Sequence, residues 1–344
     1  MKLKDIRHCP CTLSAGFSTY SPAGLRLLFN RKNASHILDF NAPNSDETVA
    51  EKMRLNSKNI SISGAQFKQS LVLEKNRLRL TEPGEPGEYI LKPIPFRPPF
   101  GKAEELPANE HLTMQIAKQA YGISTAECAL VFFKNGEPAY LTKRFDRAKD
   151  GSKIAQEDFA SIAGKSGQKD GEHYRNTGSY EDIAGEMKKH VSAYAVEIEK
   201  FYEQVVFNYL FSNGDAHLKN FSLQQTPSGD YLLSPAYDLI NTSIHIPTDS
   251  FFALEDGLFA TDFESESFQA LGYYAYDDFY EFGRRIGMME NRIKILLDKY
   301  RSHNQITLRL IQSSFLSQPI KELYAKHYLA RLKMLNNSFS DKFR

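Results

Sequence analysis

The second half of the chain contains the stretch Asn213-Gly214-Asp215-Ala216-His217-Leu218-Lys219-Asn220, and Ser234-Pro235-Ala236-Tyr237-Asp238 follows shortly after. An Asp, an Asn five residues later and a second Asp form the order of side chains that phosphoryl transfer requires. Asp215 could accept the proton of a hydroxyl nucleophile, and Asn220 and Asp238 could hold Mg²⁺ between the phosphates of a nucleotide. The stretch therefore predicts a fold that brings these three side chains together.

Protein kinases place a base Asp and a metal-binding Asn at this spacing, with a metal-binding Asp further along. Here Asn213-Gly214 stands where those kinases have His-Arg, and Leu239-Ile240 stands where they have Phe-Gly. Asn, Gly and Asp are also common in turns, because Gly adopts positive φ and Asn and Asp bond to their own backbone. On this stretch alone, a catalytic loop and a plain turn both stay open.

The composition is that of a soluble globular protein. The chain has 344 residues, of which 41% are hydrophobic and 25% charged, and 43 Lys and Arg balance 42 Asp and Glu. This length favours two domains or one two-lobed unit, and the charge balance argues against a strongly basic nucleic-acid surface. The sequence shows no membrane-length apolar run and no apolar signal segment after Met1, so we expect a cytoplasmic protein without membrane association.

The three cysteines, Cys9, Cys11 and Cys128, provide no disulfide framework, which also favours a reducing compartment. Cys9-Pro10-Cys11 follows His8 and could suggest a metal site. Zinc sites usually separate paired cysteines by two or more residues and need a second pair of ligands, which the sequence lacks. We therefore interpret these cysteines as part of a reduced, packed terminus.

In the first part of the chain we expect strands and one helix. The predicted strands are 60–62, 67–73, 77–80 and 88–92, with a possible helix at 48–55 before them. A helix is expected from Pro107 to about residue 120, and a hairpin of 127–134 with 138–145 around Asn135-Gly136. Together these elements describe an α+β lobe.

The remainder is predicted to be mostly helical, over 180–212, 268–286, 290–302 and 304–335. A small hairpin, 221–225 with 231–233, interrupts the helices, and the Gly-rich segment 164–178 is expected to be a mobile loop. The predicted class is α+β, a bilobal protein-kinase-like fold. Its mixed-sheet N-lobe would span residues 1–145 and its helical C-lobe residues 146–344.

If the second lobe holds the catalytic set, the first should supply a phosphate loop and a Lys. The stretch from Ser61 to Lys68 is a Gly-bearing turn between two predicted strands, and an ordinary hairpin turn is the alternative. Lys92 lies at a strand end from which it could reach nucleotide phosphates, and Glu110 on the following helix is its natural partner. Asp146 could bond a ribose, or simply end a charged strand.

These residues together resemble a known family, the HipA-like serine/threonine kinases, which are toxins of bacterial toxin–antitoxin pairs. The matching blocks, in family order, are Ile60-Ser61-Ile62-Ser63-Gly64-Ala65-Gln66-Phe67-Lys68, Ile90-Leu91-Lys92, Asn109-Glu110, Lys143-Arg144-Phe145-Asp146-Arg147, Gln156-Glu157-Asp158, Gly214-Asp215-Ala216-His217-Leu218-Lys219-Asn220-Phe221-Ser222 and Pro235-Ala236-Tyr237-Asp238.

The resemblance implies a role for each matching residue. Asp215 would be the catalytic base, Asn220 and Asp238 the Mg²⁺ ligands, and Lys92 the Lys that binds the ATP phosphates. The other residues implied to contact ATP are Ser63, Gly64, Ala65 and Gln66 in the phosphate loop, Lys143 and Phe145 through their backbone, Asp146 at the ribose, and His217 and Lys219 near the base. A structural role for His217 is an equal alternative.

Ser61 matches the serine that family members autophosphorylate. A phosphoserine there would repel the phosphates of ATP, so its formation should switch the kinase off. The Ser61-Ile62-Ser63 form resembles a short, HipT-like subgroup in which both serines can be modified. Longer members carry an additional N-terminal subdomain, which in the short members is a separately encoded small protein.

The resemblance also implies partners. These are a helix-turn-helix antitoxin, through which alone DNA would be contacted, and a protein substrate such as an aminoacyl-tRNA synthetase. The alternative is a catalytically weak kinase-fold protein that acts mainly by binding an antitoxin–DNA complex. A metal-dependent phosphohydrolase using Asp215, His217 and Asp238 is a third hypothesis, disfavoured because the nine histidines are scattered.

Overall fold

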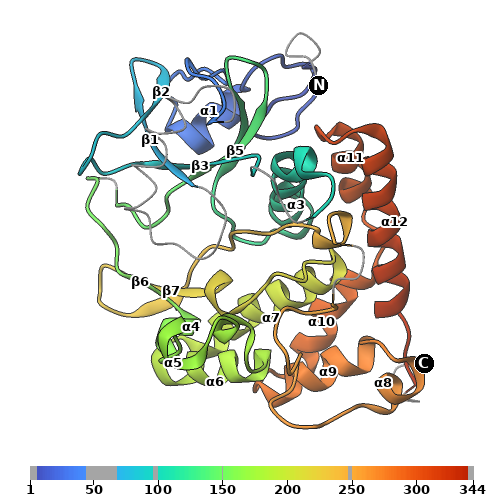
Figure 1. The fold of residues 1–344 in the computed structure, drawn as a ribbon. Coiled ribbons are helices and arrows are strands. Elements are labelled where there is room, and N and C mark those ends of the chain that lie inside the picture. The colour runs from blue at the N-terminus through green and yellow to red at the C-terminus, as the bar shows by residue number, and fades with distance from the viewer. Residues whose placement is uncertain (1–5, 44–67, 96–99, 149, 247–249, 340–344) are drawn as a thin grey trace. The chain divides into compact units, whose positions relative to one another are not determined.

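The computed structural model describes residues 6–43, 68–95, 100–148, 150–246 and 250–339 (Figure 1). The chain divides into two compact units. The first comprises residues 1–116, 125–153 and 306–321, and the second comprises residues 117–124, 154–305 and 322–344. The predicted division into 1–145 and 146–344 stays a prediction.

A five-stranded sheet forms the centre of the first unit, in the order β2-β1-β3-β5-β4. Its strands are β1 (Gln69–Glu74), β2 (Arg77–Leu80), β3 (Tyr89–Pro93), β4 (Cys128–Phe132) and β5 (Pro138–Lys143). Among the described residues every ladder is antiparallel, and parallel pairing is confined to one bridge between Ile37 and Phe132. The predicted strand at 60–62 and the possible helix at 48–55 lie outside the described residues.

The two faces of this sheet have different neighbours. Helix α1 (Pro22–Phe29), capped by the Ser21 hydroxyl, places Leu28 and Phe29 in a core cluster with Leu71, Tyr89 and Leu91. Side chains alternate along a strand, so Lys92 points to the face opposite Leu91. Strand β3 thus directs a charged side chain away from the α1 cluster.

Helix α3 (Leu106–Tyr121) follows the short η3 turn (Ala103–Glu105) and confirms the helix predicted at 107–120. It carries Glu110 in its second turn, where the side chain is buried. The hairpin predicted around Asn135-Gly136 is also confirmed, with Gly136 at φ 87° in the turn that joins β4 to β5. A Gly is required there because L-residues rarely adopt positive φ.

The second unit is mostly helical, which confirms the α+β class. Its elements are β6 (Gln156–Asp158), α4 (Phe159–Ile162), α5 (Gly167–Asp170), η4 (Tyr174–Asn176), α6 (Tyr180–His190), α7 (Tyr194–Leu210), η5 (Leu218–Asn220), β7 (Ser222–Gln225), β8 (Tyr231–Leu233), η6 (Thr242–Ile244), α8 (Glu266–Leu271), α9 (Tyr276–Arg285) and α10 (Glu290–Arg301). The predicted hairpin is β7–β8, and β6 extends it to a three-stranded sheet.

Three of the predicted long helices are broken. The stretch 180–212 forms α6 and α7, because Val191 is extended at φ −109° and ψ 109°. The stretch 268–286 is interrupted by Gly272 in the left-handed conformation, which ends α8. The stretch 304–335 forms α11 (Gln305–Ser313) and α12 (Gln318–Leu335), since Pro319 fits the first turn of a helix but not its interior.

The segment 164–178, which we expected to be a mobile loop, contains the short helices α5 and η4, and its mobility stays a prediction. Side-chain caps order its short turns. The Ser166 hydroxyl accepts the Lys169 N–H at 3.3 Å, and the Lys165 ammonium donates to the Thr177 hydroxyl at 2.8 Å. Within the part of the chain that the structure describes, no helix is both long and apolar enough to cross a membrane.

Candidate active site

The loop that holds Asp215 follows α7 and is anchored by hydrogen bonds of its backbone and of the Asn213 side chain. The Asn213 side-chain amide donates to the Asn208 side-chain oxygen at 2.9 Å, and the Gly214 N–H donates to the Thr242 hydroxyl at 2.8 Å. Thr242 donates in turn to the Ser212 carbonyl at 2.9 Å. These contacts fix the loop while the Asp215 side chain stays 61% exposed, so its carboxylate is accessible to a substrate.

His217 is buried beside the loop and does not form an ion pair with Asp215 at neutral pH. Its Nε2 lies 3.9 Å from Asp215 Oδ1, which is beyond hydrogen-bond distance. Burial, followed by the charge of Arg175, lowers its pKa to about 4, so the ring is neutral. Its backbone N–H donates to Asn220 Oδ1 at 3.3 Å, and the residue therefore helps to order the loop.

Asn220 and Asp238 meet, as the sequence predicts. The Asn220 amide nitrogen lies 3.5 Å from Asp238 Oδ2, and Asp238 adopts the left-handed conformation at φ 56°. Such a conformation is unfavourable for a non-Gly residue and is often found at functional sites. Carboxylate and amide oxygens are the donors that Mg²⁺ prefers, and Mg²⁺ sites commonly use one or two protein ligands together with phosphate oxygens. The donor chemistry of this pair therefore fits Mg²⁺.

Lys219 is held by an acidic residue from another segment. Its ammonium lies 2.9 Å from Asp158 Oδ2, and Asp158 Oδ1 also accepts the Ser161 N–H at the start of α4. The neighbouring Tyr237 hydroxyl donates to the Lys219 carbonyl at 2.8 Å. A contact between Lys219 and a phosphate would therefore compete with Asp158.

The first unit contains the predicted Lys–Glu pair. Lys92 Nζ lies 2.6 Å from Glu110 Oε1, and only 4% and 7% of the two side chains are exposed. The same ammonium lies 5.3 Å from the centre of the Tyr140 ring, a cation–π distance. The contact between Lys92 and Glu110 is confirmed.

The predicted adenine and ribose residues lie at the end of β5, which finishes at Lys143, and in the three residues after it. The Lys143 N–H donates to the Glu127 carbonyl at 2.8 Å, so this amide belongs to the sheet. Arg144 binds both oxygens of Asp146, at 2.8 and 2.5 Å. Burial raises the pKa of Asp146, but the hydrogen bonds and charge of Arg144 outweigh it, and the pKa is lowered overall. Asp146 is thus an oriented carboxylate.

The phosphate-loop residues Ser61, Ser63, Gly64, Ala65 and Gln66 lie outside the described residues. Cys9 and Cys11 are buried free thiols in the core cluster.

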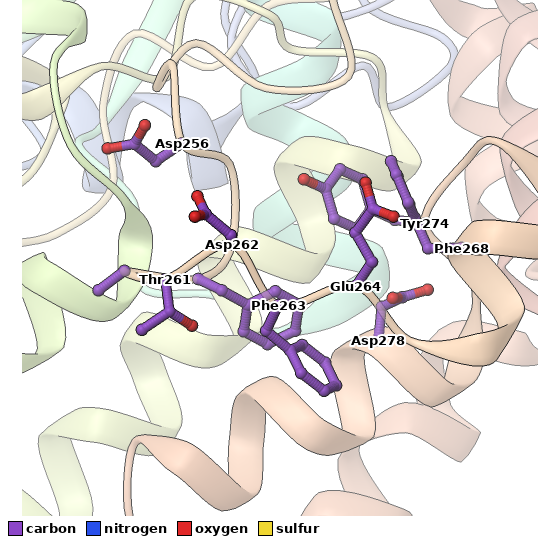
Figure 2. Close-up of a pocket in the computed structure, with 10 residues that line it drawn as sticks. Asp256, Thr261, Asp262, Phe263, Glu264, Phe268, Tyr274 and Asp278 are labelled. Carbon is purple, nitrogen blue, oxygen red and sulfur yellow. The ribbon is translucent and has the colours of Figure 1, made fainter.

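A pocket of about 480 Å³ in the second unit involves none of the predicted site residues (Figure 2).

A family model described as the HipA-like C-terminal domain matches residues 60–306, well over half of the chain. The chain belongs to this family. It is 30% identical, over 95% of both proteins, to a Haemophilus influenzae protein named "Putative kinase". It is 26% identical over 54% of its length to the Shewanella oneidensis serine/threonine-protein kinase toxin HipA, of which the match covers 44%.

A solved structure supports the fold of this HipA-like chain. The Shewanella oneidensis complex of HipA, HipB and operator DNA contains a chain that superposes with a TM-score of 0.62. The match covers 80% of this chain and 65% of that one, at 22% identity. At this identity the likeness concerns the fold alone, and it confirms the expected kinase-like class.

Sequence reasoning missed the residues that position the HipA-like site. Thr242 and Tyr180, whose hydroxyl donates to the Ala216 carbonyl at 2.9 Å, are distant in sequence from the loop that they anchor. Arg144 could have been found, because it stands two residues before Asp146, so a cation and a carboxylate lie near each other in the sequence. Nothing in the sequence pairs Asp158 with Lys219.

Proposed function

We propose that this protein is an ATP- and Mg²⁺-dependent protein serine/threonine kinase that acts as the toxin of a toxin–antitoxin system. The observation that carries the proposal is the catalytic loop of the second unit. The Asp215 side chain is accessible and its loop is held by hydrogen bonds. In the same unit the Asn220 amide nitrogen lies 3.5 Å from Asp238 Oδ2. Membership of the HipA-like family supports this assignment.

Each residue of the loop has a role in the proposed reaction. Asp215 accepts the proton of the substrate hydroxyl. Asn220 and Asp238 would hold Mg²⁺, which neutralises phosphate charge when bound. His217, neutral because its pKa is about 4, keeps the loop ordered without adding charge beside the base. Lys219 would contact the ATP phosphates, and its ion pair with Asp158 would break when it does so.

The first unit would bind the nucleotide. Glu110 fixes Lys92 so that its ammonium is presented to the phosphates, and Asp146 is oriented by Arg144 to accept from the ribose. Lys143 and Phe145 would contact adenine through their backbone. Because the Lys143 N–H is used in the sheet, its carbonyl is the group assigned to adenine. Ser63, Gly64, Ala65 and Gln66 form the phosphate loop of the proposal.

Regulation and partners follow from the same family. Phosphorylation of Ser61, and of Ser63, would place negative charge where the ATP phosphates bind and stop transfer. A helix-turn-helix antitoxin would neutralise the protein, as the HipB complex of the Shewanella oneidensis HipA suggests. We also propose a cytoplasmic location, a translation component such as an aminoacyl-tRNA synthetase as the substrate, and a separately encoded small protein as a further partner.

Mass spectrometry of the purified chain after incubation with Mg-ATP tests the proposal. We expect phosphate on Ser61 or Ser63 and a loss of further transfer as it accumulates. Phosphate found only outside residues 61–63 would contradict the autoinhibition. Intact ATP binding without any phosphate transfer would instead favour a kinase-fold protein that acts by binding its antitoxin.

A further inference from the structure

The pocket of about 480 Å³ in the second unit has acidic and aromatic walls (Figure 2). Its carboxylates are Asp256, Asp262, Glu264 and Asp278, and no Lys, Arg or His is among the residues that line it. In Figure 2, Asp256 and Asp262 lie on one side of Phe263, and Glu264 and Asp278 lie on the other. The volume is within the range of small-molecule and side-chain binding pockets.

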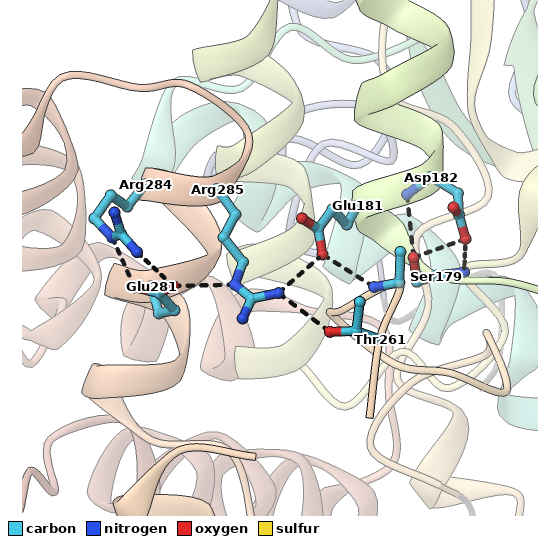
Figure 3. A network of polar contacts seen from close by, with 8 residues as sticks. Ser179, Glu181, Asp182, Thr261, Glu281, Arg284 and Arg285 are labelled. Atoms are coloured by element: carbon cyan, nitrogen blue, oxygen red, sulfur yellow. Dashed lines mark hydrogen bonds and ion pairs between the residues drawn. The ribbon is translucent and has the colours of Figure 1, made fainter. Parts of the chain in front are cut away.

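The exposed carboxylates of this pocket have no ion-pair partner in the described chain, although Arg285 contacts the lining residues Phe259, Thr261 and Phe263. Asp256, Asp262 and Glu264 are exposed, and none of the three forms an ion pair with a described residue. The adjacent network is different. Arg285 contacts both Glu281, at 3.0 Å, and Glu181, at 3.6 Å (Figure 3). Carboxylates just outside the pocket are therefore paired, whereas those that line it are left to attract an external cation.

One lining carboxylate is fully buried. Asp278 accepts from the Ser265 hydroxyl and from the Ala275 N–H, both at 2.7 Å, and it forms no ion pair among the described residues. Burial raises its pKa to about 6. A cation that entered the pocket would compensate this carboxylate where the chain itself does not.

The aromatic wall already carries a guanidinium group. The Arg285 guanidinium carbon lies 4.2 Å from the centre of the Phe263 ring and 5.0 Å from that of Phe259. Arg285 also donates to the Thr261 hydroxyl, which ties the ring-bearing loop to α9. Arg285 therefore occupies Phe259 and Phe263 from within the chain, and the other lining rings, Phe268 and Tyr274, are those that an entering cation would meet.

The loop that walls the pocket is bonded to the catalytic loop through α6. The Tyr180 N–H donates to the Gly257 carbonyl at 3.0 Å, and the Tyr180 hydroxyl donates to the carbonyl of Ala216, the residue after Asp215. The Asp256 N–H donates to the Gly178 carbonyl just before α6. Tyr180 thus links the carbonyl next to Asp215 directly to Gly257, which adjoins the lining residue Asp256.

We infer that the pocket binds a basic side chain, Arg or Lys, of the protein substrate, and so sets which serines or threonines are phosphorylated. The charge of the pocket selects a cation, its Phe268 and Tyr274 rings offer a packing surface for the side chain, and its connection to Asp215 selects the substrate as the occupant. The inference rests on the proposed kinase function and adds a specificity determinant to it.

The test uses serine peptides that each carry one arginine at a different distance from the serine, and a matched set with uncharged citrulline. Binding to the full chain is measured by fluorescence anisotropy, and phosphoryl transfer from Mg-ATP is measured separately. At one spacing we expect the arginine peptide to bind and react about 10-fold better than its citrulline match, the effect of one well-placed cation contact.

The Asp262→Asn/Glu264→Gln variant should lose this preference. The Glu104→Gln/Asp298→Asn variant, which removes the same charge at exposed residues that do not line the pocket, should keep it. Equal binding of arginine and citrulline peptides at every spacing, or a preference that survives in the pocket variant, would overturn the inference. A preference in binding but not in transfer would assign the pocket to another partner and overturn the substrate as occupant. Failure of all transfer with the binding preference intact would count against the kinase function, not against the pocket.

Discussion

Lys92 Nζ and Glu110 Oε1 lie 2.6 Å apart in a part of the first unit where both side chains are more than nine-tenths buried. Taking two charges out of water costs several kcal/mol for each, and their attraction only offsets that cost when the geometry is good. Such a pair adds little to stability, so its presence in a buried position needs another explanation. Presenting a fixed ammonium to phosphate is that explanation in the proposed function.

Removing one partner of this pair should be far worse than removing both. Glu110→Gln leaves a buried ammonium without its carboxylate, and we expect a loss of about 3 kcal/mol in the free energy of unfolding. Lys92→Met/Glu110→Leu should regain most of that stability and yet show no phosphoryl transfer. Urea unfolding and transfer assays on the three proteins check this. A double variant as unstable as Glu110→Gln would contradict it.

The Thr242 hydroxyl is expected to act by positioning the catalytic loop. Thr242→Val keeps the shape but removes the acceptor of the Gly214 N–H and the donor to Ser212, at a cost of about 1–3 kcal/mol for an unsatisfied buried group. We expect kcat to fall by at least about 10-fold with little change in the KM for ATP. Thr242→Ser, which keeps the hydroxyl, should restore kcat. Equal kcat values for the Val and Ser variants would contradict a positioning role of the Thr242 hydroxyl.

The buried His217 should make stability depend on pH. Its pKa of about 4 in the folded state lies below its ordinary value of 6.5, so the unfolded chain binds more protons between these values. The stabilising contribution is therefore present above pH 6.5 and is lost as the pH falls to about 4. It can reach about 3 kcal/mol.

The measurement compares wild type with His217→Asn from pH 7 to pH 4. The difference in the free energy of unfolding should shrink as the pH falls, because other titrating groups, including His111 and Asp278, are common to both proteins and cancel. The exposed Gln269→Asn variant, which removes no titrating group, is the control, and its difference from wild type should stay constant. A pH-independent difference for His217→Asn would show that the ring is not buried in its neutral form.

Local sequence signals were enough to predict most elements of the sheet. Strand β2 has the predicted bounds, and Asn135-Gly136 lies in the turn between β4 and β5. The long helices were predicted less well, because apolar periodicity continues across breaks. The spacing of apolar residues does not show that Gly272 adopts the left-handed conformation and ends α8. It also does not show that Pro319 must lie in the first turn of α12. Capping side chains such as Ser166 turned a composition typical of a loop into short ordered turns.

Contacts in the site could be predicted where both residues belong to sequence motifs that resemble those of the family. Lys92 with Glu110, and Asn220 with Asp238, were expected together and meet. Their supports were not predictable, because Thr242 contacts the loop only through the tertiary fold. The acidic pocket was missed for the same reason, since Asp256 and Asp278 are brought to one cavity by segments with no shared pattern.

The most direct test of the central claim is the transfer of radiolabelled phosphate from Mg-ATP by wild type, by Asp215→Asn and by Asp150→Asn, an exposed acidic residue outside the site. We predict that Asp215→Asn transfers no more than about one thousandth of the wild-type amount, as expected for loss of a general base, while it still binds ATP and unfolds like the wild type. Asp150→Asn should match the wild type. Transfer by Asp215→Asn at the wild-type rate would contradict the assignment of this loop as the catalytic centre.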